Sequence, residues 1–111
     1  MIFGILLNSS TTETLLNNLY EADFDLADVS VVMQDLKLRN AVAKDVGPLK
    51  GANMDNISGK LTQAGLSAHD ASLYRDLLAQ GKVLIAMTVA PESQSAAVEM
   101  LQDHSAEMIK E

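Results

Sequence analysis

Cysteine is absent from this chain, and aromatic residues are scarce. Without thiols the protein has no disulfides, no thiolate metal site and no cysteine nucleophile. Tryptophan is also absent, and with only two Phe and two Tyr the core must be mainly aliphatic. A chain without cysteine suits a reducing compartment, so we expect a cytoplasmic protein.

Positive charge is the second deficit. Eight Lys and Arg stand against fifteen Asp and Glu, which gives a formal net charge of −7. Nucleic acids and anionic membrane surfaces both need clustered basic residues to neutralise their phosphates. The composition therefore predicts a protein that binds neither nucleic acid nor a membrane.

Long hydrophobic runs are also missing. The apolar run at the N-terminus, Ile2 to Leu7, has no basic residues before it and is far too short to span a bilayer. We interpret it as a first strand rather than a signal peptide. The length of 111 residues predicts one domain, residues 1–111, without room for a second.

The N-terminal part of the chain has a β-α-β pattern. After the first strand, Ser10 and Glu13 have the spacing of a capping box at a helix start. Apolar residues then recur at helical spacing at Leu15, Leu16, Leu19 and Tyr20. The alternating stretch Asp28 to Asp35 predicts a second, half-buried strand.

The C-terminal part repeats this pattern. Lys82 to Val89 is an apolar strand, and the helix after it has Pro91 in its first turn. Ala106 to Glu111 has the length and charge of a short edge strand. Between the two units, Leu36 to Val46 can form one or two helical turns, and the Gly- and Asn-rich stretch from residue 47 to 60 is predicted to be a loop.

Two such units predict an α+β fold of the ferredoxin-like sandwich type. In it, two β-α-β units build a four-stranded antiparallel sheet, here with an extra helical insertion between them. The two most apolar runs, Ile2 to Leu7 and Val83 to Val89, are expected to be the central strands.

The stretch Gly65 to Val89 predicts a well-capped helix that leads into a central strand. Ser67 is the expected N-cap and Asp70 stands three residues later, as in a capping box. Gly81 follows the helix as its C′ residue. Tyr74 lies among leucines at helical spacing, so we interpret it as a core residue.

The same stretch resembles the general stress protein 17M-like family and related heat- or low-temperature-induced domains. The matching positions are Gly65, Leu66, Ala71, Tyr74, Leu78, Gly81, Val83 and Leu84. Glu21 to Val32 is similar to the end of that family's first helix and its second strand. The resemblance implies a stress-linked context without a defined activity. Many members have a long Gly- and Ala-rich insertion, whereas Leu36 to Ala64 here is short and polar.

No pattern for catalysis, a cofactor or a metal is present. His69 and Asp70 are neighbours on a helix and therefore point in different directions. His104 has only Asp103 and Glu107 nearby, and the segment Asp23 to Asp28 lacks the glycine and the terminal Glu of a calcium loop. We therefore expect a protein that is not an enzyme and has no cofactor.

Two functions remain. The favoured one is a stress-associated module that binds itself or a protein partner, and the alternative is a regulatory sensor domain for a small ligand. The residues on both sides of each central strand are apolar. We therefore expect the second sheet face to be covered by the Ser67–Gln80 helix or by a second chain. We favour a homodimer, with an interface at Ile2, Gly4, Leu6, Val32, Leu84, Ala86 and Thr88.

Overall fold

The computed structural model describes residues 1–111. Its strands are β1 (Ile2–Leu6), β2 (Val29–Val32), β3 (Val83–Met87) and β4 (Glu107–Lys110). Its α-helices are α1 (Ser9–Glu21), α2 (Leu36–Val42), α3 (Ile57–Gln63), α4 (Ala68–Ala79) and α5 (Gln94–Asp103). Two 3-10 turns, η1 (Leu26–Asp28) and η2 (Pro91–Ser93), precede β2 and α5. None of the helices has both the length and the hydrophobicity that a crossing of the bilayer requires.

The four strands form one antiparallel sheet in the order β2-β3-β1-β4. This confirms the predicted α+β class and the four-stranded antiparallel sheet. The two most apolar strands, β1 and β3, lie in the middle and are buried along their whole length. Central strands have side chains covered on both faces, which explains why neither alternates between apolar and polar residues.

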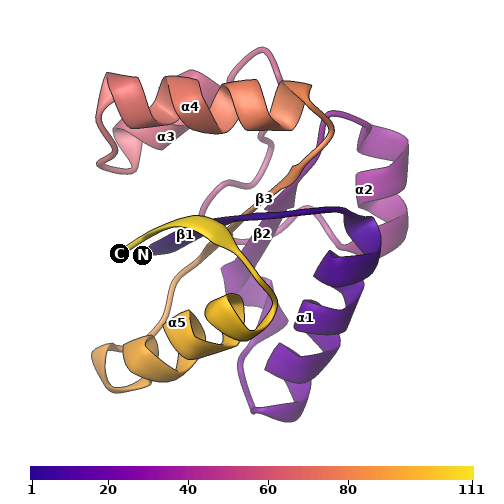
Figure 1. Cartoon of the computed structure of the whole chain (residues 1–111), viewed down its shortest axis with the longest axis vertical. Helices are drawn as coiled ribbons and strands as arrows, with labels where there is room; N and C mark the ends of the chain where they lie inside the picture. Colours follow the sequence, from indigo (N-terminus) through magenta and orange to yellow (C-terminus); the bar gives the residue numbers. More distant parts are fainter.

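Helices cover both faces of the sheet (Figure 1). On one face, α1 and α5 pack over a core that includes Ile2, Leu6, Val31, Ile85 and Leu101. On the other face, α3 and α4 pack over a second core. That core includes Phe3, Ile5, Leu61, Tyr74, Leu78 and Leu84. The helical insertion between the two units therefore supplies the cover of the second face from within the chain.

The register of β1 against β3 corrects the predicted interface. Ile2 pairs with Met87, and Leu6 pairs with Val83, so these residues share the α1–α5 face. Leu84 and Ala86 belong to the opposite core, together with Val32. A Cβ on Gly4 would contact Leu101 of α5, which places Gly4 on the α1–α5 side. The seven residues therefore do not form one face, and all except the exposed Thr88 are buried within the monomer.

The helix α3 begins within the stretch, residues 47–60, that the sequence predicted to be a loop. Its Asn-rich entry forms local turns, because Asn53 Oδ1 accepts hydrogen bonds from the backbone N–H groups of Asp55 and Asn56. The helix then buries Ile57 and Leu61 completely against the second core. Tertiary burial thus stabilises a helix of seven residues, which its short length and Gly59 disfavour.

The first helix begins earlier than the capping-box spacing predicted. Asn8, rather than Ser10, is the N-cap of α1, and its Oδ1 accepts a hydrogen bond of 2.9 Å from the N–H of Thr11. Ser10 lies inside the helix. Both residue types cap helices well, so the sequence alone did not discriminate between them.

The edge strand β2 is covered by the segment that follows α2. Ser30 Oγ donates a hydrogen bond to the Val46 carbonyl and accepts one from the N–H of Leu49. Gly47 lies so close to β2 that a Cβ there would be 2.7 Å from Ser30 Oγ. The segment therefore lies directly against β2 near Ser30 and hinders pairing of this part of the edge with another chain.

Candidate functional site

The largest hollow of the molecule is a groove between α1, α2 and η1, with a volume of about 630 Å³. We call it the α1–α2 groove. It is lined by Glu13, Leu16, Asn17, Leu26, Ala27, Val29, Ala41, Val42, Ala43, Lys44 and Val46. Its volume falls in the range of ~300–1,000 Å³ that is usual for small-molecule sites, which are also mostly apolar.

The α1 wall follows from helical periodicity. Glu13, Leu16 and Asn17 are spaced i, i+3 and i+4, so their side chains project from the same face of α1. Leu16 is nearly buried and Val29 of β2 is buried, which gives the groove an apolar floor. The two polar residues, Glu13 and Asn17, are exposed at the rim.

The opposite wall comes from the end of α2 and the segment after it. Figure 1 shows α2 beside the N-terminal part of α1. Ala41 and Ala43 have small side chains and therefore leave space between the two walls. Lys44 follows them and is exposed, so one wall bears a carboxylate and the other an ammonium group.

The three polar side chains of the groove have no partners within the protein. The ion pairs of the molecule join Arg39 to Asp45, Lys82 to Glu107, and Lys110 to Asp70. Glu13, Asn17 and Lys44 make no side-chain hydrogen bond or ion pair. Their hydrogen-bonding capacity is therefore available to water or to a bound molecule.

The neighbouring Asp45 does not neutralise Lys44, because other groups hold its carboxylate. Asp45 Oδ1 accepts a hydrogen bond of 2.9 Å from the N–H of Gly51 and lies 3.3 Å from Arg39 Nη1. The bond from Gly51 is the main cause of a lowered pKa of Asp45, and the charge of Arg39 adds to it. These contacts also fix the segment that forms the second wall of the groove.

A smaller hollow of about 350 Å³ lies at the end of the sheet from which α1 and α2 begin. It is lined by Asn8, Ser9, Met33, Gln34, Asp35, Leu38, Gly81 and Val83. The side chains of Asn8 and Asp35 are already engaged as N-caps of the two helices. This hollow therefore offers less free hydrogen-bonding capacity than the α1–α2 groove.

The residues predicted to be structural lie on α4 and at its ends. Ser67 Oγ caps the helix by accepting a hydrogen bond of 3.1 Å from the N–H of Asp70. The Asp70 carboxylate does not accept the hydrogen bond from the Ser67 N–H that would complete a capping box. It lies 3.6 Å from Lys110 Nζ of β4 instead. Gly81 has a φ of +90° directly after the helix.

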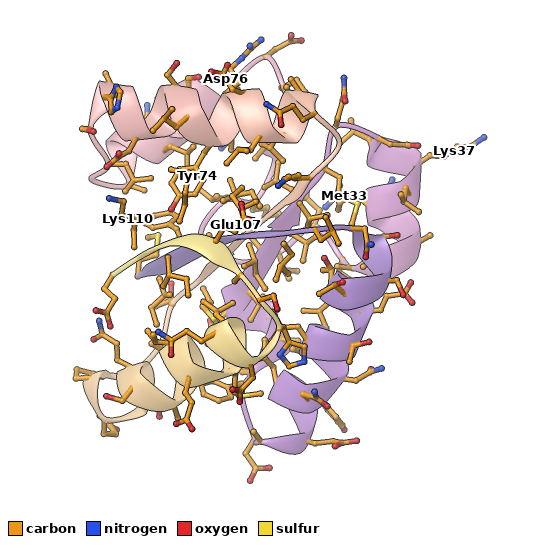
Figure 2. All side chains as sticks on the ribbon, in the orientation of Figure 1. Met33, Lys37, Tyr74, Asp76, Glu107 and Lys110 are labelled. Carbon is orange, nitrogen blue, oxygen red and sulfur yellow. The ribbon has the colours of Figure 1, made fainter.

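Tyr74 links α4 to the edge strand β4 through a hydrogen bond. Its side chain is fully buried, and its hydroxyl donates a hydrogen bond to the Met108 carbonyl. In Figure 2, Tyr74 projects from α4 toward β4, with Lys110 close by. Burial, with a contribution from the charge of Asp70, raises the pKa of Tyr74 well above its usual value near 10. The phenol therefore remains a hydrogen-bond donor at neutral pH.

The two histidines do not form a site together. His104 Nδ1 lies 2.7 Å from the Met100 carbonyl, so it carries the proton and donates to that oxygen. Its Nε2 then accepts a hydrogen bond from Asn18 Nδ2, at 2.9 Å. His69 is exposed on α4. No three His, Asp or Glu side chains lie close enough together to share a metal ion.

Sequence reasoning did not find the groove. Its polar residues come from two segments about thirty positions apart, and only the tertiary fold brings them together. The one local signal is the run of small residues around Ala41 and Ala43, next to Lys44. Comparison with protein-family models, curated proteins and solved structures found no match to this chain.

Proposed function

We propose that this protein is a non-enzymatic binding module that holds a small, mainly apolar ligand in the α1–α2 groove. The observation that carries this proposal is a groove of about 630 Å³ with an apolar floor and three polar side chains without partners. Small-molecule sites combine these two properties, since the apolar surface supplies affinity and a few polar groups supply orientation. Neither histidine lines the groove, which favours binding over acid-base chemistry there.

A module that binds itself or a protein partner is the second candidate. The exposed leucines Leu7, Leu36 and Leu38, with 66%, 44% and 44% of their surface accessible, support it. The homodimer remains part of this candidate. The homodimer was expected because one apolar face of the sheet needed a cover, but the chain's own helices cover both faces.

The proposal extends to the type of fold and the biological context. The order β2-β3-β1-β4, with α1 and α5 on the same face, supports a ferredoxin-like sandwich. The resemblance of Gly65 to Val89 to the general stress protein 17M-like family supports a role in stress. The absence of cysteine is in keeping with a cytoplasmic location.

The test is a screen of the full chain against small apolar molecules, followed by amide chemical shifts in NMR. Binding in the groove is expected to shift the amides of Leu16, Ala27 and Val42, and to raise the melting temperature by mass action. Ala41→Phe places a ring inside the groove and is expected to abolish the shifts.

Ala79→Phe is the matched control, because Ala79 is also an exposed helical alanine but lines neither hollow. It is expected to leave binding unchanged. A screen in which no molecule shifts the groove amides would contradict the proposed function. So would binding that Ala41→Phe and Ala79→Phe weaken equally.

A further inference from the structure

We infer that the ligand of the α1–α2 groove is a zwitterion with an apolar body, such as a short apolar peptide with free termini. This inference rests on the proposed function and specifies its ligand class. It follows from how charge is distributed over the two walls of the groove.

The two walls of the groove bear opposite charges. The only acidic side chain of the lining is Glu13 on α1, and the only basic one is Lys44 beyond α2. Neither has an ion-pair partner in the protein. A ligand with an ammonium group at one end and a carboxylate at the other complements both walls at once.

The groups around these two charges leave both of them free to bind a ligand. Asp45, next to Lys44, is held by Arg39 and by the N–H of Gly51, so it does not compete for the Lys44 ammonium. Asn17 lies one turn after Glu13 on the same face of α1 and adds an amide that can both donate and accept hydrogen bonds. The polar groups of the groove thus suit a peptide, which has charged ends and amides between them.

The surface between the two charges is apolar. Eight of the eleven lining residues are hydrophobic, and Leu16 and Val29 form the floor. A strongly polar zwitterion would gain nothing from this floor, whereas leucine-like side chains would bury apolar surface on it. The volume of about 630 Å³ suits a peptide of a few residues.

The experiment compares four trileucine peptides and free leucine as probes of the full chain, by NMR titration of the groove amides. The peptides have both termini free, only the ammonium blocked by acetylation, only the carboxylate blocked as an amide, or both blocked. The peptide with free termini is expected to bind most tightly. Each exposed charge contact is expected to change affinity by roughly three- to fivefold.

Two charge variants assign each end of the ligand. Glu13→Gln is expected to remove the advantage of the free ammonium and to retain that of the free carboxylate. Lys44→Met is expected to do the reverse. Glu99→Gln and Lys60→Met remove the same charges elsewhere, on α5 and α3, and are expected to change neither preference.

The outcomes separate this inference from the proposed function. Equal affinity of all four peptides for the groove would overturn the zwitterion and leave the binding module standing. The same holds if uncharged apolar molecules bind the groove and none of the peptides does. If neither peptides nor uncharged molecules shift the groove amides, the proposed function fails as well. Tighter binding of free leucine than of trileucine, with the same dependence on Glu13 and Lys44, supports the zwitterion and identifies an amino acid as its source.

Discussion

At the scale of single residues, the ends of the helices are the most clearly determined feature. The residues after α1, α3, α4 and α5 all have positive φ, and they are Asp23, Gly65, Gly81 and Ser105. At α4 the N–H of Gly81 bonds to the Leu78 carbonyl, as in a Schellman motif. Two of the four positions lack glycine, so the hydrogen-bond pattern determines the conformation even where the residue type opposes it.

Gly81 is expected to tolerate Asn better than Val. A Cβ at this position meets no atom within 4 Å, so the cost of a substitution comes from the φ of +90° alone. Gly81→Val should lower the free energy of unfolding by about 1 kcal/mol or more, because a β-branched residue is disfavoured at positive φ. Gly81→Asn should lower it less, since Asn adopts this conformation more readily. Urea titration of the two variants checks this, and equal stability of the parent and Gly81→Val would contradict it.

At the scale of elements, the segment after α2 has two structural roles. It covers the edge of β2 through Ser30, and it forms the second wall of the groove from Ala43 to Val46. Both depend on the close approach of Gly47 to the backbone of β2. The conformation of this segment therefore links the protection of the sheet edge to the shape of the groove.

Gly47 and Gly51 give a matched pair of variants that isolates this close approach. Both have positive φ, of +87° and +80°, but only at Gly47 would a Cβ meet other atoms. Gly51→Ala should cost ~1 kcal/mol of stability through its backbone conformation. Gly47→Ala should cost a further ~1–3 kcal/mol, because β2 and the segment must move apart.

The measurement for this pair is chemical denaturation, together with the NMR shifts of the groove amides. Gly47→Ala is expected to change the shifts of Val29 and Val46, whereas Gly51→Ala is expected to leave both in place. Equal losses of stability in the two variants would show that the segment does not depend on contact with β2.

At the scale of the whole molecule, the sheet is the middle of three layers. The helices α3 and α4 lie on one side of it, and α1 and α5 lie on the other (Figure 1). Leu84 lies in the second core with no exposed surface. A charge at Leu84 would therefore be buried inside the monomer rather than between two chains.

Leu84→Glu is expected to unfold the protein instead of dissociating a dimer. An unpaired buried carboxylate is among the few changes that cost more than ~4 kcal/mol, which is comparable with the whole stability of a small domain. Leu7→Glu is the control, since Leu7 is 66% exposed, and it should change stability by no more than ~0.5 kcal/mol.

Circular dichroism and light scattering together check this prediction. A folded Leu84→Glu monomer derived from a dimeric parent would contradict it and would restore the sheet face as an interface. The mass of the parent at high concentration also tests the proposed homodimer, whichever surface that dimer uses.

The sequence by itself determined the class of fold and most of its elements. Apolar runs identified β1 and β3, and helical periodicity with Ser67 and Gly81 identified α4, because these signals depend on neighbouring residues only. The sequence also showed which residues of β1, and which of β3, project to the same side of their own strand, because successive side chains in a strand point to opposite faces. The sequence did not show which side chains of β1 lie on the same face of the sheet as which side chains of β3. That depends on the register between the two strands.

Only the tertiary structure decided the cover of the sheet and the position of the groove. The helix α3 forms because Ile57 and Leu61 are buried against the second core, which outweighs the local preference of its sequence. The groove exists because folding places Glu13 and Lys44 on facing walls over the floor of Leu16 and Val29. Contacts between distant segments leave little trace in local sequence patterns, and only such contacts bring the two walls of the candidate site together.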